Sequence, residues 1–308
     1  MARSGYSNLT RFAWFYYAYL LFVILFGAWV RISGSGAGCG GSWPTCHGEL
    51  IPPSAETKTL IEYSHRATSG ALGLLSLVLL AWVFRAGASR RCKMAAVVTL
   101  CLVLVEALIG AGLVLRELVA DDASLARAIV IALHLGNTLI LAAAAGFTAL
   151  WSGESFSAPR QGRSGLWISL VLVAGFMVVS MAGAVTALGD TLFPVEPSAG
   201  TTVFEHVVRD LAPSRHFLMQ LRIVHPLLAL ALTGGLLAAV SFWRARLSGT
   251  PLSKWVKALH VLTYAQVAVG VLNIVLHAPT SMQLLHLLLA HLLWLCLVMV
   301  TANSDFSR

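Results

Sequence analysis

The sequence predicts an all-α polytopic membrane protein whose eight transmembrane helices form two pseudo-symmetric four-helix bundles. Three observations lead to this fold class: an apolar composition, long unbroken apolar segments and an internal repeat. Of the 308 residues, 58% are hydrophobic and 11% are charged, whereas about 25% of residues are charged in an ordinary soluble domain. The mean hydropathy is +0.81. This composition excludes a soluble globule, a disordered chain and a nucleic-acid-binding protein.

The apolar segments are long enough to be membrane-spanning helices, which need about 20 predominantly apolar residues. Eight segments meet this requirement: 12–31, 60–84, 94–115, 124–150, 165–188, 217–243, 255–277 and 282–302. The strands of a membrane β-barrel would instead alternate apolar and polar residues. The first segment exceeds the apolar core of a signal peptide, which has about 7–15 residues, so we expect an uncleaved anchor.

The basic residues predict the orientation of these spans. If the N-terminus is cytoplasmic, 13 of the 21 Lys and Arg residues lie on the inner side and eight on the outer side. An excess of basic residues in cytoplasmic loops is typical of membrane proteins. We therefore expect both termini in the cytoplasm of a prokaryotic cell, with the protein in the plasma membrane. No Arg- and Ser-rich transit segment precedes the first span.

The two halves of the chain repeat one another. Matching residues recur 152–160 positions apart, and the pairs are His65 and His225, Glu106 and Gln266, Gly110 and Gly270, His134 and His286, and Gly27 and Gly183. We therefore predict two domains, 1–152 and 153–308. Since four is an even number of spans, both copies cross the membrane in the same sense.

Four histidines occupy repeat-related places in the even-numbered spans, namely His65, His134, His225 and His286. Ionisable residues inside spans are rare and point to function. Each half offers two facing imidazoles, which is what a bis-histidine haem requires in a bundle core. A zinc or copper site would need further ligands nearby. For any one histidine alone, an interhelical hydrogen bond is the alternative.

A single carboxylate distinguishes the first half from the second. Glu62 precedes His65 by one helical turn, whereas the matching position before His225 is Arg222. A carboxylate beside a haem edge can accept a proton or stabilise a positive centre. The alternative is a helix N-terminal residue favoured by the helix dipole, paired with Arg66. The asymmetry suggests that the first haem is acted on and the second passes electrons.

Two cysteines share the first outer loop, in the segment Cys39-Gly-Gly-Ser-Trp-Pro-Thr-Cys46. A disulfide can persist outside the plasma membrane, and this short loop would let the two sulfurs meet. Free thiols are the alternative. A metal site that includes His47 is a third reading, incomplete because it has only three ligands.

Taken together, these residues resemble the N-terminal signature of haem A synthases. The matching motifs are GAWVRISGSG at 27–36, a loop from Cys39 to Gly48 that contains WPTCHG, and Glu62-x-x-His65-Arg66. The similarity covers nearly the whole chain, including the eight spans. It implies two pseudo-symmetric bundles and oxidation of a methyl group of haem O to the formyl group of haem A. In the family this reaction proceeds through hydroxylation, and the aldehyde forms by loss of water.

The resemblance also implies residue roles, cofactors and partners. By position, His65 and His134 would hold the substrate haem, and His225 and His286 would hold a haem b cofactor. Glu62 would be the catalytic carboxylate, and Cys39 and Cys46 match the cysteines of the family's first outer loop. The implied partners are haem O, a haem O synthase, a membrane electron donor and the lipid bilayer. Whether the chain forms a homo-oligomer is open.

The chain departs from the family pattern at three places. Glu106 stands where members often carry Gln, Pro226 follows His225 where many have Arg, and residues 190–216 lack a further cysteine pair. The rival function is a di-haem cytochrome that moves electrons between quinol and an outer acceptor, but it does not explain Glu62. A transporter is a weaker rival, because it predicts broken helices and a polar midplane site.

Overall fold

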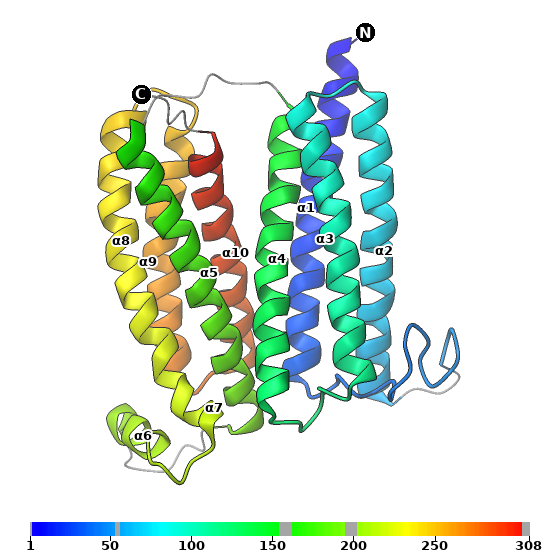
Figure 1. Ribbon diagram of the computed structural model, residues 1–308, viewed down its shortest axis with the longest axis vertical. Helices are drawn as coiled ribbons and strands as arrows, with labels where there is room; N and C mark the ends of the chain where they lie inside the picture. The colour runs from blue at the N-terminus through cyan, green and yellow to red at the C-terminus, as the bar shows by residue number, and fades with distance from the viewer. Residues whose placement is uncertain (1, 53–55, 154–161, 195–201, 304–308) are drawn as a thin grey trace. The chain divides into compact units, whose positions relative to one another are not determined.

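The computed structural model describes residues 2–52, 56–153, 162–194 and 202–303, and within these ranges helices joined by loops make up the chain (Figure 1). Its contacts divide it into two compact units, Met1–Ser155 and Phe156–Arg308. The predicted all-α class is confirmed. In the described ranges, extended pairing is limited to an isolated bridge between Cys46 and Glu49.

Unit 1 is a closed ring of four helices. These are α1 (Ala2–Ile32), α2 (Thr57–Arg85), α3 (Arg90–Leu115) and α4 (Leu125–Trp151). Each helix packs against the next one, and α4 packs back against α1. Ser89 and Ser124 begin α3 and α4 as N-caps, since each side chain accepts a backbone N–H of the first turn. Helices α2 and α4 are therefore diagonal in the ring.

Unit 2 repeats this order of neighbours. Its long helices are α5 (Gly162–Leu192), α8 (Val224–Leu247), α9 (Ser253–Val275) and α10 (Thr280–Ala302). Consecutive helices pack together, and α10 packs back against α5. Helices α8 and α10 are the diagonal pair here. This shared topology is what a duplicated four-helix unit would produce.

The described part of the chain contains eight helical segments long and apolar enough to cross a membrane. They coincide with the eight predicted spans, so the chain is a multi-pass membrane protein. A lipid interior cannot hydrogen-bond to backbone groups, and helices satisfy those groups within each segment.

The sixth span is interrupted, which corrects the continuous helix expected over 217–243. It consists of α7 (Phe217–Gln220), the 3-10 turn η1 (Leu221–Ile223) and α8. The cause lies at Pro226, which has no N–H to donate to the carbonyl of Arg222. The tighter hydrogen bonding of a 3-10 turn bridges the gap.

A short amphipathic helix, α6 (Val203–Asp210), lies in the connection between α5 and α8 and was not predicted from the sequence. It begins with a capping box. The Thr202 hydroxyl accepts the N–H of Glu205, and the Glu205 carboxylate accepts the N–H of Thr202.

A buried hydrogen bond joins the first two helices of unit 1. Tyr16 of α1 is fully buried, and its hydroxyl lies 2.7 Å from the Ser76 hydroxyl of α2. A buried hydroxyl that loses its partner destabilises a protein by about 1 kcal/mol or more. This bond therefore links α1 to α2 in the interior of unit 1.

We expect Tyr16→Phe to lower the melting temperature of the detergent-purified protein, because Ser76 loses an interhelical partner. Tyr264→Phe is the matched control, since the same hydroxyl is removed from a side chain that is 56% exposed. The cost at Tyr16 should be about 1 kcal/mol. Equal melting temperatures for the two variants would contradict this account.

Candidate functional site

The four predicted histidines share one packing arrangement, in which each ring lies against a glycine of the preceding long helix. The pairs are Gly27 with His65, Gly110 with His134, Gly183 with His225, and Gly270 with His286. A β-carbon added to these glycines would lie 3.1, 3.8, 2.9 and 3.0 Å from Cε1 of the respective histidine. At three of the four positions that distance is shorter than ordinary van der Waals contact. The glycines therefore make room for the imidazoles.

In unit 2, the two rings have a separation that suits a shared iron. The centres of the His225 and His286 rings are 6.2 Å apart, with an angle of 88° between their planes. Two imidazoles on opposite faces of one metal, with bonds of about 2 Å, place their ring centres about 6 Å apart. Nδ1 of His225 lies 3.0 Å from the carbonyl oxygen of Val179. That bond orients the ring and leaves Nε2 for a metal.

His286 has a different partner. Its Nε2 lies 3.2 Å from the amide nitrogen of Gln266 on α9. Its Nδ1 is buried and has no hydrogen-bond partner among the described residues. A buried polar atom without a partner usually indicates a missing ligand or water. A metal bound at Nε2 of His286 would therefore displace a single contact, the one with Gln266.

In unit 1, His134 is paired with the carboxylate of Glu106 on α3. The distance from His134 Nε2 to Glu106 Oε1 is 2.9 Å. Asn137 and Thr138, both on α4, also donate to this carboxylate. Glu106 is thus an acceptor for three side chains of α4. The sequence placed Glu106 in span 3 but did not show its partner.

His65 lies diagonally across the ring, on α2. Its ring packs edge-on against Phe26 of α1, with centres 5.5 Å apart. Its Nδ1 is buried and has no partner in the part of the chain that the structure describes. The rings of His65 and His134 are only partly buried. Unit 1 therefore presents one unpaired imidazole nitrogen and one that is engaged by a carboxylate.

These donors fit a haem better than a bare metal ion. Within the described ranges, no group of three or more His, Cys, Asp or Glu side chains could hold a metal ion. A zinc or copper site needs three or four protein ligands. A haem iron needs only the axial pair, because the porphyrin supplies its other ligands. The unpaired nitrogens, the glycine contacts and the 6.2 Å ring separation are consistent with that requirement.

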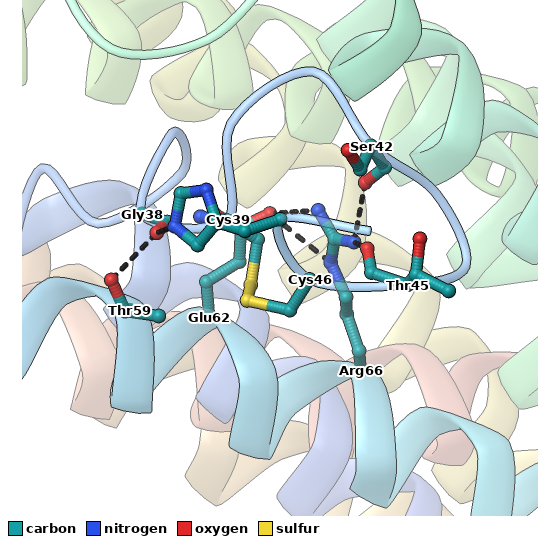
Figure 2. The surroundings of a disulfide bond; sticks show 9 residues. Gly38, Cys39, Ser42, Thr45, Cys46, Thr59, Glu62 and Arg66 are labelled. Atoms are coloured by element: carbon teal, nitrogen blue, oxygen red, sulfur yellow. Dashed lines mark hydrogen bonds and ion pairs between the residues drawn. A yellow bond between two sulfur atoms is a disulfide. The ribbon is translucent and has the colours of Figure 1, made fainter. Parts of the chain in front are cut away.

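Glu62 is buried where α2 meets the first long loop, and Figure 2 shows its surroundings. It is 3% exposed. Its Oε2 accepts the backbone N–H of Cys39 at 2.8 Å, and its Oε1 pairs with the Arg66 guanidinium at 2.5 Å. The pairing with Arg66 was the alternative expected from the sequence. The carboxylate therefore joins the loop to the helix that carries His65.

The Cys39–Cys46 disulfide is present, which confirms that prediction. The two sulfurs are bonded to each other and are not free thiolates, and Nε2 of His47 lies 2.9 Å from the carbonyl oxygen of Gly38. A metal site formed by Cys39, Cys46 and His47 is therefore wrong. The disulfide closes a small ring of backbone over the start of α2 (Figure 2).

Arg66 and Gly38 fix this ring of backbone to α2. The Arg66 guanidinium donates to the carbonyls of Ser42 and Thr45, each at 2.6 Å. Gly38 approaches so closely that a β-carbon would lie 2.5 Å from the carbonyl of Lys58, and its own carbonyl accepts the Thr59 hydroxyl at 2.6 Å. Arg66 thus holds the loop by two carbonyls within the disulfide ring, and Gly38 holds it just before the ring begins.

Unit 2 has a cation at the matching position, and the sequence did not predict its partners. Arg222, at the position that matches Glu62, pairs with Asp190 at 3.0 Å and with Asp210 at 2.9 Å. Its guanidinium also donates to the carbonyls of Gly189, at 2.9 Å, and Phe193. The cation thus binds the C-terminal end of α5 and the end of α6 to η1, the turn that leads into α8. The only signal in the sequence was the charge reversal between Glu62 and Arg222.

Comparison with known proteins gives a consistent family match. Residues 10–298 match COX15-CtaA, described as "Cytochrome oxidase assembly protein". A Thermus thermophilus protein named "Protoheme IX farnesyltransferase" is 42% identical over 308 residues, which is 99% of this chain and 50% of that protein. The "Heme A synthase" of Exiguobacterium sibiricum is 40% identical over 122 residues, covering 39% of this chain and 38% of that protein.

The "Heme A synthase" of Geobacillus kaustophilus is 40% identical over 126 residues, which cover 41% of this chain and 37% of that protein. The chain thus spans about half the length of the Thermus relative, and its matches to the two other proteins are shorter.

We expect Gly183→Ala to lower the melting temperature, because the new methyl group would force the His225 ring from its bond to Val179. Gly234→Ala is the control, since no atom lies within 4 Å of the added carbon. That control should match or exceed the unaltered protein, because alanine favours helix by about 1 kcal/mol over glycine. A melting temperature for Gly183→Ala as high as that of the control would show that the glycine is not needed for ring packing.

Proposed function

The chain belongs to the COX15-CtaA family of cytochrome oxidase assembly proteins, and we propose that it is a haem A synthase of a bacterial plasma membrane. In this proposal it oxidises a methyl group of haem O to the formyl group of haem A. The observation that carries the proposal is the set of four glycine-backed histidines, with the His225 and His286 rings 6.2 Å apart. The relatives named "Heme A synthase" support the same reaction.

In this proposal the two units hold haems with different tasks. His65 and His134 hold the substrate haem in unit 1, and His225 and His286 hold haem b in unit 2. A bis-histidine haem supplies reversible one-electron transfer. Val179 positions the His225 ring for it through the 3.0 Å bond to Nδ1. Unit 2 therefore serves as the electron-transfer site, since it has no carboxylate at the position of Glu62.

Glu62 is the proposed catalytic carboxylate of unit 1. It lies one helical turn before His65, and its two oxygens are fixed by Arg66 and the Cys39 N–H. When a carbon that bears two hydroxyls loses water, one hydroxyl gives up its proton and the other takes up a proton and leaves as water. A fixed carboxylate can accept the first proton and return it to the leaving hydroxyl. Arg66 and the disulfide loop act as positioning groups, because they hold the Glu62 carboxylate in place.

The Thermus relative named "Protoheme IX farnesyltransferase" supports the proposal of a partner enzyme. Half of that Thermus protein aligns with this chain, and its name describes transfer of a farnesyl group to protohaem. Haem O is a farnesylated haem, so we propose that an enzyme of that class supplies the substrate. We also propose cytoplasmic termini, on the strength of the 13-to-8 distribution of basic residues.

One prediction of this proposal concerns the haem bound to the purified protein. The protein purified from membranes should carry extractable haem b, with smaller amounts of haem O or haem A on chromatography. His225→Ala and His286→Ala should each remove most of the haem b, whereas His260→Ala should not, because the His260 ring packs on Tyr264 away from the proposed ligands. A purified protein without haem absorption would exclude both the synthase and the di-haem cytochrome.

Another prediction of this proposal concerns Glu62. Glu62→Gln should slow conversion of haem O by a factor of about 10²–10⁴, the usual contribution of a general acid or base. Haem O should accumulate while haem b content stays unchanged. The control is Glu56→Gln, an exposed carboxylate just before α2. Normal haem A formation by Glu62→Gln, with electron transfer intact, would favour the di-haem cytochrome instead.

A further inference from the structure

The two units differ in the residue that faces the second histidine of each pair. In unit 1, Glu106 Oε1 lies 2.9 Å from His134 Nε2. In unit 2, the repeat-related Gln266 places its amide nitrogen 3.2 Å from His286 Nε2. The same atom of each imidazole is engaged, by a carboxylate in one unit and by a carboxamide in the other.

This difference determines where each imidazole carries its hydrogen. A carboxylate can only accept, so His134 must carry hydrogen on Nε2 to bond to Glu106. A carboxamide has both a donor and an acceptor, so Nε2 of His286 can keep its lone pair beside Gln266. A metal needs that lone pair. His286 is therefore prepared as a ligand through Nε2, and His134 is not.

The two contacts also differ in strength. Glu106 is fixed by donation from Asn137 and Thr138, and Asn137 is itself held at 3.1 Å from the carbonyl of Leu102. Hydrogen bonds to a charged group are about twice as strong as neutral ones. In unit 2, by contrast, the Gln266 oxygen is buried without a partner among the described residues. Gln266 therefore holds His286 less firmly than Glu106 holds His134.

We propose that Glu106 competes with haem iron for His134 and thereby makes unit 1 the exchangeable haem site, whereas Gln266 allows unit 2 to retain its haem. The inference rests on the proposed function, in which unit 1 binds a substrate and releases a product. A site that turns over must let its haem leave, and a resident cofactor must stay. The residue at this repeat-related position differs between the units, and Glu106 meets the first need while Gln266 meets the second.

A purely structural role for Glu106 makes the opposite prediction. If its carboxylate only tied α3 to α4, its replacement would loosen unit 1 and weaken haem binding. Competition predicts the reverse, because loss of the carboxylate would free His134 for the iron. The direction of the change in haem retention therefore separates the two roles, and no enzyme activity needs to be measured.

The experiment measures haemin release from each unit separately, in the full chain. His225→Ala with His286→Ala confines haemin to unit 1, and His65→Ala with His134→Ala confines it to unit 2. Each protein is loaded with haemin in detergent, and transfer to excess apomyoglobin is followed by absorption. Glu106→Gln is tested in the first background and Gln266→Glu in the second. Melting temperatures confirm that each variant is folded.

We expect Glu106→Gln to slow haemin release from unit 1 about tenfold, and Gln266→Glu to speed release from unit 2 by a similar factor. Release from unit 1 that is unchanged or faster in Glu106→Gln would overturn the inference and leave the haem sites themselves established. If that variant does not fold, an unchanged release from unit 2 in Gln266→Glu overturns it. If the unaltered protein binds no haemin, the proposed function fails as well.

Discussion

An imidazole in an apolar bundle needs partners for its polar nitrogens, and a neighbouring glycine makes room for each of the four rings. Nδ1 of His65 and Nδ1 of His286 have no partner among the described residues. Gly183 brings α5 close enough for Val179 to bond to His225. For His134 and His286, the partner is a polar side chain of the adjacent helix, Glu106 and Gln266 respectively. The helix spacing, the ring orientations and the nitrogens left for a ligand all follow from these contacts.

The larger features could be predicted from the sequence because lipid imposes them. A bilayer requires long apolar helices, so hydropathy located all eight spans. The internal repeat singled out four of the ten histidines, and the structure places each against a repeat-related glycine. The interruption of the sixth span could have been expected as well, because a helix running continuously from 217 to 243 would place Pro226 in its interior. Proline is tolerated only in the first turn of a helix, and α8 begins at Val224.

The pairings between side chains could not be predicted, because they depend on how each helix is rotated in its ring. Glu106 and His134 are 28 residues apart, and no periodicity shows that they meet. The same holds for Arg222 and its two aspartates. The pairing of Glu62 with Arg66 follows from their i, i+4 spacing. Its bond to the Cys39 N–H depends on the path of a loop, which composition does not determine.

The reversal of charge between Glu62 and Arg222 has a consequence for how such a protein can arise. In both units a charged side chain one turn before the first histidine holds a preceding segment, but Glu62 does so through the backbone N–H of Cys39 and Arg222 through Asp190 and Asp210. The order of neighbouring helices is the same in the two units despite this difference. After a gene duplication, the two copies could therefore diverge by point substitutions at polar positions. A single ancestral bundle would in this way acquire two distinct polar sites without a new topology.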